Sequence, residues 1–313
     1  MFVSRAVVRV RKSNKCLDNF FSKLLESLFS KAVSLGVRSR QVLDGDDAKR
    51  YLKEAEAAWN VYEPRAVESS VAAVDSGWNT LLYHGFFLYG LKAVAVDRGG
   101  NDVVPSVAEV ELVARTEGLL PQLYVEAVAE SHEHRLAAES SANLDSTLVD
   151  GSLLARTVKA SRLKGLKMFN EYLANLRPLL DRRIFFVSKY SQDNSMFKGL
   201  LGDVYYINKS TSETGYTQPA ARELETVGSY VWVFYVRLAK NTPALHFEST
   251  QPVSASDIEG LMDALSTTSV KGYPAELLMA HQGAGFSYEL MVMLAEVAGL
   301  AGFEQAREVL SPE

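Results

Sequence analysis

Two acidic residues stand directly after apolar runs at separate points of the chain. Asp75 follows residues 71–74, and Asp150 follows the Leu-Val pair at 148–149 and precedes a Gly-Ser pair. A buried strand that delivers a carboxylate before a Gly or Ser is a common way for α/β folds to present catalytic acids or metal ligands. Asp-Gly and Asp-Ser-Gly are also ordinary turn signals, so one copy alone is ambiguous. The repetition after two apolar runs favours a pair of functional carboxylates.

Two convergent carboxylates would suit a divalent cation. Their hard oxygen atoms match the preference of Mg²⁺ or Mn²⁺. Two-ion phosphodiester hydrolysis places its cations about 3.5–4 Å apart, between such carboxylates. The pattern therefore indicates a nuclease or another phosphoryl-transfer enzyme, provided that the two strands are neighbours.

Glu133 lies between the two aspartates in the sequence, on a predicted helix. It shares one helical face with Glu126 and Glu130. A charged helix face usually meets solvent, so two of the three glutamates are expected there, and Glu130 is the alternative to Glu133 as a site residue. His132 and His134 flank Glu133 but diverge on a helix, which argues against a His-Glu-His metal cluster.

Three further residues could serve the same site. Lys189 follows the strand predicted at 183–188 and opens a polar stretch, where it could contact a phosphate or simply be solvated. Tyr273 precedes Pro274 at the expected start of a helix, and His281 lies about two helical turns further on. A lone histidine is more often structural, but one aimed at a carboxylate site could act as acid, base or ligand.

A basic segment at 158–167 offers a second way to contact DNA. It contains Lys159, Arg162, Lys164 and Lys167. Such a helix could track a phosphate backbone, or its charges could only be solvated.

These residues are positioned by a predicted order of strands and helices that begins at residue 71. Gly85 and Gly90 are expected bends within a long strand, Pro121 suits the first turn of a helix, and Pro178 is expected to end another. The predicted strands are 71–75, 81–96, 106–114, 146–149 and 183–188, and the predicted helices are 121–140 and 158–177. Three strands, helix, strand, helix, strand is the order of an RNase H-like core, a mixed sheet flanked by helices.

The rest of the chain is expected to flank this core. Residues 1–65 are predicted to form an N-terminal helical arm, and residues 66–313 an RNase H-like domain with a C-terminal extension. In the extension we expect a polar loop region at 189–220 with a short strand at 203–207, a hairpin of 230–238 with 244–247, and helices at 257–265, 275–281 and 288–300.

The arm contains the clearest amphipathic helix of the sequence, at 17–35, and a charged helix at 46–61. The apolar face of the first comprises Leu17, Phe20, Phe21, Leu24, Leu25, Leu28 and Phe29. Such a face usually packs on the core of its own chain. A contact with a second copy or with a partner protein is the alternative, because the segment is terminal and rich in Phe and Leu.

Composition limits the class of protein. The formal net charge is −5, from 33 Lys and Arg against 38 Asp and Glu, which argues mildly against a protein that depends on non-specific affinity for DNA. The single cysteine, Cys16, excludes an internal disulfide and fits the cytoplasm. Residues 1–15 lack the apolar core of a signal peptide, and no segment is a convincing membrane span.

The chain resembles the NurA nucleases of archaea, which act beside the hexameric HerA translocase in processing DNA ends. Four short motifs carry the resemblance, and they occur in the family's order over roughly residues 70–285. They are VAAVDSG at 71–77, LVDGSL at 148–153, FFVSK at 185–189 and VKGYPAELLMAH at 270–281. Their order and spacing make the set more specific than any one motif.

The resemblance implies a function in some detail. It implies a divalent cation, Mn²⁺ by preference over Mg²⁺, and 5′-to-3′ exonuclease and single-strand endonuclease activity on DNA in the resection of double-strand breaks. It also implies a homodimer that docks on HerA. The implied metal ligands are Asp75, Glu133 and Asp150, and the implied catalytic residues beside them are Lys189, Tyr273 and His281.

Two features depart from the family's pattern or lie outside it. The family usually reads Asp-Gly-Gly or Asp-Gly-Ser at the first motif, whereas this chain has Asp75, Ser76, Gly77 and Trp78. Trp78 could stack on a base, although core packing is favoured. The arm carries no motif, so its assignment to a dimer or HerA contact depends on its amphipathic face.

Two other functions compete with the nuclease. A non-catalytic RNase H-like adaptor would clamp DNA or a partner, and a phosphatase-like hydrolase would use the same carboxylates on small phosphate esters. The chain contains no Gly-x-x-x-x-Gly-Lys-Ser/Thr motif, so it is not expected to hydrolyse ATP.

Overall fold

The computed structural model describes residues 15–114 and 120–300. The chain divides into two compact units, Met1–Tyr51 and Leu52–Glu313. Residues 1–14, in which no signal peptide was expected, lie outside the described residues. The same is true of the side chains of Leu17, Phe20 and Phe21, which were expected on the apolar face of the arm.

The first unit consists mainly of one long helix, α1 (Lys15–Asp44). Leu24, Leu25, Leu28 and Phe29 recur at helical spacing on α1, and all four side chains are exposed, Phe29 by 70%. A second helix, α2 (Asp46–Ala58), begins with two acidic residues, which stabilise the positive end of the helix dipole.

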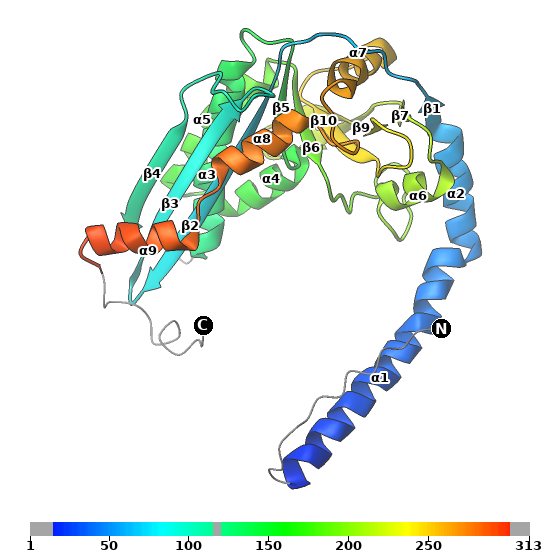
Figure 1. Ribbon diagram of the computed structural model, residues 1–313, viewed down its shortest axis with the longest axis horizontal. Helices are drawn as coiled ribbons and strands as arrows, with labels where there is room; N and C mark the ends of the chain where they lie inside the picture. The colour runs from blue at the N-terminus through cyan, green and yellow to red at the C-terminus, as the bar shows by residue number, and fades with distance from the viewer. Residues whose placement is uncertain (1–14, 115–119, 301–313) are drawn as a thin grey trace. The chain divides into compact units, whose positions relative to one another are not determined.

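The second unit is built on one mixed sheet with an RNase H-like centre (Figure 1). Its three antiparallel strands are β2 (Val71–Tyr83), β3 (Phe86–Val96) and β4 (Val107–Val113). The strands β5 (Ser146–Asp150) and β6 (Ile184–Ser188) then run parallel to β2. The spatial order β4-β3-β2-β5-β6 places β2 at the centre, where the chain crosses from the antiparallel to the parallel part.

The sheet continues beyond β6 with strands that are antiparallel to one another. Among the described residues it has ten strands, in the order β1-β7-β9-β10-β6-β5-β2-β3-β4, with β8 paired to β9. The added strands are β1 (Trp59–Val61), β7 (Gly215–Thr217), β8 (Ala220–Leu224), β9 (Ser229–Arg237) and β10 (Leu245–Ser249). The buried, β-branched and aromatic composition of β9 and β10 explains their place inside this sheet.

Helices cover both faces of the sheet (Figure 1). One face packs on α3 (Pro121–Ser140), α4 (Leu153–Ala160) and α5 (Lys167–Leu180). The other face packs on α7 (Ala255–Ser266) and α8 (Ala275–Ala284). The helix α9 (Tyr288–Val297) lies against the far ends of β2 and β3, and α6 (Asp203–Ser210) lies between β6 and β7 in the chain.

Several predicted elements were wrong in extent or type. Asp75 does not end a strand, because β2 continues to Tyr83 and forms a long hairpin with β3 through a turn at Gly85. The single helix expected at 158–177 is two helices, α4 and α5, and Pro178 lies inside the last turn of α5. Pro178 removes one backbone hydrogen bond from a helix that ends two residues later, at Leu180.

Two further expectations fail for local reasons. Residues 203–207 are not a strand but the start of α6, where Gly202 is the residue before the helix and Asp203 favours its first turn. The helix expected at 46–61 ends at Ala58, because residues 59–61 pair as β1 with β7. No described helix has the length and apolar character that a membrane crossing requires.

Candidate metal centre

Asp75 and Asp150 lie side by side on the central strands of the sheet. The parallel register pairs Val71 with Ser146 and Val74 with Val149, so the next residue on each strand is an aspartate. Side chains alternate along a strand, and Ala73 belongs to the core on the α7–α8 side. Asp75 therefore points to that same face, where both carboxylates can meet one ligand.

His281 completes a cluster with these two aspartates. Its Nδ1 lies 2.9 Å from Oδ2 of Asp75. One possible ligand atom from each of Asp75, Asp150 and His281 lies within 4.8 Å of the others. Asp75 is buried, Asp150 half-buried and His281 exposed, so the cluster is anchored in the sheet and open on the histidine side.

Gly77 allows the helix of the histidine to come this close. A Cβ atom on Gly77 would lie only 2.3 Å from the carbonyl oxygen of Ala284, at the end of α8. Only glycine permits this contact between β2 and the backbone of α8. The Asp75-Ser76-Gly77 motif thus supplies both the carboxylate and the space for the helix that carries His281.

The electrostatics of Asp75 suit a cation site. Burial and the neighbouring charge of Asp150 raise the pKa of Asp75, and the hydrogen bond with His281 opposes them. Two carboxylates that share a site repel each other, and a bound cation removes that repulsion. The donor set of two carboxylates and one imidazole fits a divalent ion such as Mn²⁺ or Mg²⁺.

The loop after Asp150 is held by a buried glutamate that the sequence reading did not single out. Gly151 has a positive φ of 105°, and Ser152 caps α4 by accepting a hydrogen bond from the amide of Ala155. Glu248 on β10 accepts hydrogen bonds from the hydroxyl of Ser152, at 2.5 Å, and from the amide of Leu154. These contacts fix the start of α4 and hence the place of Asp150.

Lys189 and Tyr273 lie beside the two aspartates. Nζ of Lys189 is 3.2 Å from Oδ2 of Asp150 and 4.5 Å from the centre of the Tyr273 ring. The hydroxyl of Tyr273 is buried and has no hydrogen-bond partner among the described residues. Burial and the charges of Asp150 and Asp75 raise the pKa of Tyr273, so the hydroxyl stays protonated and can donate.

Glu133 occupies a different position from the three clustered residues. Ser76 follows Asp75 and points to the opposite face of the sheet, where its hydroxyl donates to Glu133 on α3. The other oxygen of Glu133 forms a buried ion pair with Arg156 at 2.5 Å. Burial raises the pKa of Glu133 to about 7, against the opposing charge of Arg156. Glu133 therefore contacts Ser76, the residue next to Asp75, but its two oxygens are already engaged by Ser76 and Arg156.

Arg156 is a second residue that the sequence reading missed. Besides Glu133, its guanidinium contacts the carbonyl oxygen of Asp150 at 2.5 Å, so it links the helical glutamate to the strand of the second aspartate. It lies on α4, six residues after Asp150 and just before the basic segment at 158–167. Its burial could not be read from local spacing.

The other charged residues considered in the sequence are accounted for by packing and ion pairs. Lys159 pairs with Glu126 at 2.5 Å and with Glu130 at 2.8 Å, so Glu130 points to α4 and not to the aspartates. His134 is buried against the rings of Tyr172 and Phe186. The two basic residues of α4, Arg156 and Lys159, both pair with glutamates of α3.

Comparison with known proteins gives this arrangement a family. The model of the NurA domain matches residues 69–286, more than half of the chain. The chain belongs to the NurA domain family. This match spans all the candidate residues, from Asp75 to His281, and confirms the resemblance and the enzyme class, a nuclease, that were expected from the four motifs.

A curated relative and several solved structures are similar to this chain. The DNA double-strand break repair nuclease NurA of Sulfurisphaera tokodaii is 22% identical over 267 residues, which cover 71% of this chain and 79% of the relative. The crystal structure of the NurA nuclease from Sulfolobus solfataricus matches with a TM-score of 0.68 at 19% identity, over 87% of this chain and 96% of that one.

Two further NurA crystal structures were solved with ligands. One contains manganese and matches with a TM-score of 0.63 at 13% identity, over 86% of this chain and 98% of that one. Another contains dAMP and manganese and matches with a TM-score of 0.59 at 12% identity, over 93% of this chain and 98% of that one. These similarities confirm the RNase H-like fold expected from the order of strands and helices.

Proposed function

We propose that this chain is a divalent-metal-dependent DNA nuclease whose cation is held by Asp75, Asp150 and His281. The observation that carries the proposal is the convergence of these three ligands on one face of the sheet. Membership of the NurA domain family and the manganese and dAMP in structures of relatives support the same chemistry. Mn²⁺ is the preferred ion and Mg²⁺ the alternative.

The cation would supply Lewis-acid activation of the phosphodiester and of the attacking water. The side chains around it have separate tasks in this proposal. Lys189 has a charged Nζ at the edge of the site and would bind a phosphate oxygen. Tyr273 has a buried hydroxyl that can donate a hydrogen bond, and it would orient the phosphate or the leaving oxygen.

His281 would connect the site to solvent. Its Nδ1 is close to Asp75, and its side chain is 65% exposed. It can therefore bind the cation or exchange a proton with the leaving group. Glu133 is proposed as a third carboxylate that joins the site when its contacts with Ser76 and Arg156 are broken, or that stabilises Asp75 through Ser76 when they are kept.

The finer activities are inferred from the family resemblance. They are 5′-to-3′ exonuclease and single-strand endonuclease action in double-strand break resection, with a HerA-type hexameric ATPase that feeds DNA to a homodimer. The exposed apolar face of α1 supports the assignment of the arm to a dimer or ATPase contact. A motor that delivers DNA would also reduce the need for a basic surface on an acidic chain.

The test is the degradation of 5′-labelled single-stranded DNA with and without Mn²⁺. Wild type is expected to cleave only with the cation, and Asp75→Ala and Asp150→Asn to lose at least about a thousandfold in rate, as expected when a cation ligand in a catalytic site is removed. Asp181→Asn, an exposed aspartate at the end of α5, is the matched control and should keep full activity.

The failures are informative in different ways. Wild type that is inactive with Mn²⁺, with and without a HerA-type partner, would contradict the nuclease and favour an adaptor. Full activity of Asp75→Ala would contradict the site assignment alone. Turnover of small phosphate esters in place of DNA would indicate a phosphatase.

A further inference from the structure

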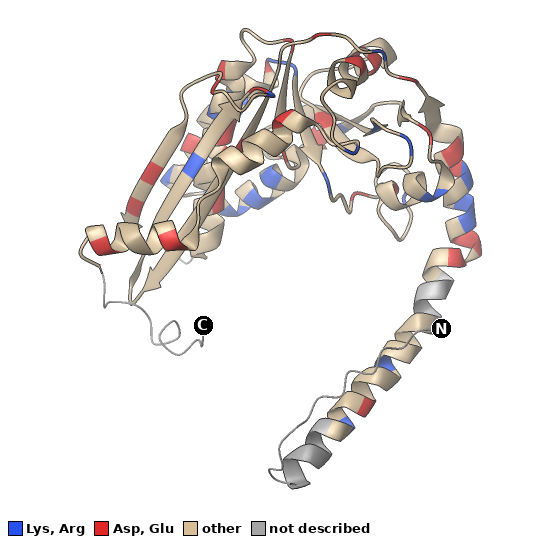
Figure 2. Ribbon diagram, in the orientation of Figure 1, with Lys and Arg blue, Asp and Glu red and all other residues tan. Residues whose placement is uncertain are grey.

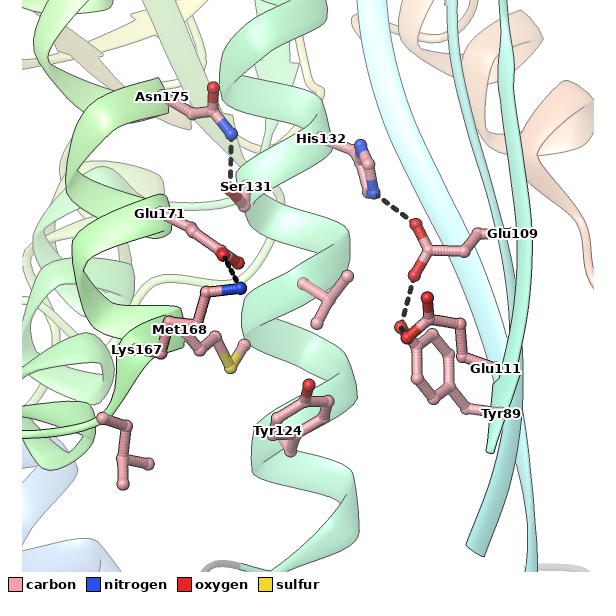
Figure 3. Close-up of a pocket in the computed structure, with 12 residues that line it drawn as sticks. Tyr89, Glu109, Glu111, Tyr124, Ser131, His132, Lys167, Met168, Glu171 and Asn175 are labelled. Atoms are coloured by element: carbon pink, nitrogen blue, oxygen red, sulfur yellow. Dashed lines mark hydrogen bonds and ion pairs between the residues drawn. The ribbon is translucent and has the colours of Figure 1, made fainter. Parts of the chain in front are cut away.

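A pocket with a volume of about 630 Å³ lies on the face of the sheet that α3 covers. Figure 3 shows it between α5 on one side and β3 and β4 on the other, with α3 as its floor. The metal centre lies on the α8 face, so the two sites are separated by the sheet. Volumes of this size are typical of sites for small organic ligands.

The charge of this pocket is negative. Glu109 and Glu111 enter from β4, and Glu171 enters from α5 (Figure 3). Glu171 is paired with Lys167 at 3.1 Å, whereas the hydroxyl of Tyr89 is shared between Glu109 and Glu111. The strand β4 has no Lys or Arg, and its acidic residues stand out in Figure 2. No lysine or arginine of β4 therefore neutralises Glu109 or Glu111.

Glu109 is held as a carboxylate. Nε2 of His132 lies 3.0 Å from its Oε2, and this contact is the largest influence that lowers the pKa of Glu109. The hydrogen bond from Tyr89 acts in the same direction, against the effect of burial. Glu109 thus stays ionised, and its negative charge would repel phosphates and DNA.

The floor of the pocket is aromatic and apolar. Tyr124, Val128 and Met168 line it from α3 and α5, and Tyr89 stands at the side of the two glutamates. Aromatic rings and carboxylates both attract ammonium and guanidinium groups, and apolar side chains can contact the alkyl chain that carries such a group. A bare metal ion would leave the apolar floor unused.

We propose that this pocket binds an organic cation, an alkyl chain that carries an ammonium or guanidinium group. The chain would lie on Tyr124 and Met168, and the cationic end would contact Glu109 and Glu111. This ligand chemistry occurs in free polyamines and in the lysine or arginine side chains of proteins, and the experiment separates the two sources.

The test is calorimetric titration of the metal-free full-length protein, without DNA, at about 0.15 M salt to screen weak surface binding. The probes are spermidine, agmatine and the capped dipeptide Arg-Lys. We expect saturable binding of at least one probe, at one site per chain. The affinity should fall at least tenfold in Glu109→Gln/Glu111→Gln and severalfold in Tyr124→Leu, which keeps an apolar side chain but removes the ring.

Matched controls separate this pocket from other acidic surfaces. Glu225→Gln removes one exposed carboxylate elsewhere and should bind as wild type does. Asp150→Asn tests the metal centre and should also bind the probes normally. Melting curves of every variant verify that it is folded, and Glu171→Gln provides a third pocket variant if one of the others does not fold.

Each outcome bears on the proposal. Binding of spermidine or agmatine assigns a free small molecule, and binding of the dipeptide alone assigns a side chain of a protein. No saturable binding of any probe overturns the proposal. Equal affinity in Glu109→Gln/Glu111→Gln, or loss of binding only in Asp150→Asn, overturns it as well, because the cation would then occupy the metal centre.

Discussion

The carboxyl group of Asp75 is the most sensitive reporter of the metal centre. Burial and the charge of Asp150 raise its pKa, and His281 lowers it. Protons and the cation compete for this carboxylate, so cation affinity should fall as the pH drops through the raised pKa, above the value of about 3.9 for an ordinary aspartate. In the metal-free protein the same shift contributes stability at low pH that is lost as the pH rises through that pKa.

A carbon NMR titration of the metal-free protein, labelled at aspartate carboxyl groups, measures this directly. We expect the pKa of Asp75 to fall in Asp150→Asn, which removes the like charge, and to rise in His281→Ala, which removes the hydrogen bond. Asp181→Asn should leave it unchanged. Shifts in the opposite directions would show that the three groups do not interact as the distances indicate.

Residue types and spacing predicted some residues of the site and missed others. The two aspartates could be predicted because parallel strands in register bring residues of the same motif position together. The position of Glu133 could not be predicted, because its contact with Arg156 joins α3 to α4 across the core. Glu248 was missed for the same reason, since it reaches Ser152 from a strand nearly a hundred residues away.

At the scale of elements, the packing of α8 on β2 depends on Gly77. A methyl group there would collide with the backbone of α8 at Ala284. We predict that Gly77→Ala lowers the free energy of unfolding by about 1–3 kcal/mol, as overpacking usually does, and reduces cleavage because it displaces His281. Chemical denaturation and the DNA assay measure the two effects.

Gly260→Ala is the matched control. Gly260 lies in α7 with open space around its Cβ position, so alanine there should be neutral or stabilise by up to about 1 kcal/mol. Equal losses of stability in the two variants would contradict the close approach of α8 to β2.

The order of elements was easier to predict than their ends. The first three strands, α3, β5 and β6 follow from apolar runs and turn residues. The sequence did not show that Asp75 lies inside a long strand, because Ser76, Gly77 and Asn79 weaken the strand pattern that pairing with β3 maintains. Likewise, the β-prone residues at 203–207 hide a helix whose first residue, Asp203, is held by hydrogen bonds from the amides of Met196 and Phe197.

At the scale of the whole molecule, the helix of the arm could be predicted from the sequence, but the extension of the sheet could not. Helical periodicity indicated α1, whereas the joining of β7, β9 and β10 to the central sheet required pairing between distant segments. The function of α1 stays a prediction. A contact with a second chain would remove the apolar surface of its exposed leucines and Phe29 from water.

We predict that Leu25→Asp/Phe29→Asp converts a dimer into a monomer in sedimentation experiments and leaves the metal centre intact. Charges on an apolar contact are costly to bury. Ser30→Asp, on the other side of α1, is the control and should remain dimeric. A dimer that survives the double substitution would place the contact elsewhere in the chain.

Anomalous scattering from a crystal soaked in Mn²⁺ would show whether Asp75 and Asp150 hold one divalent cation on the α8 face of the sheet. We predict a manganese peak within about 2.0–2.6 Å of a carboxylate oxygen from each aspartate, and no peak there in Asp150→Asn. A manganese ion bound elsewhere in the wild type, with no peak between Asp75 and Asp150, would contradict it.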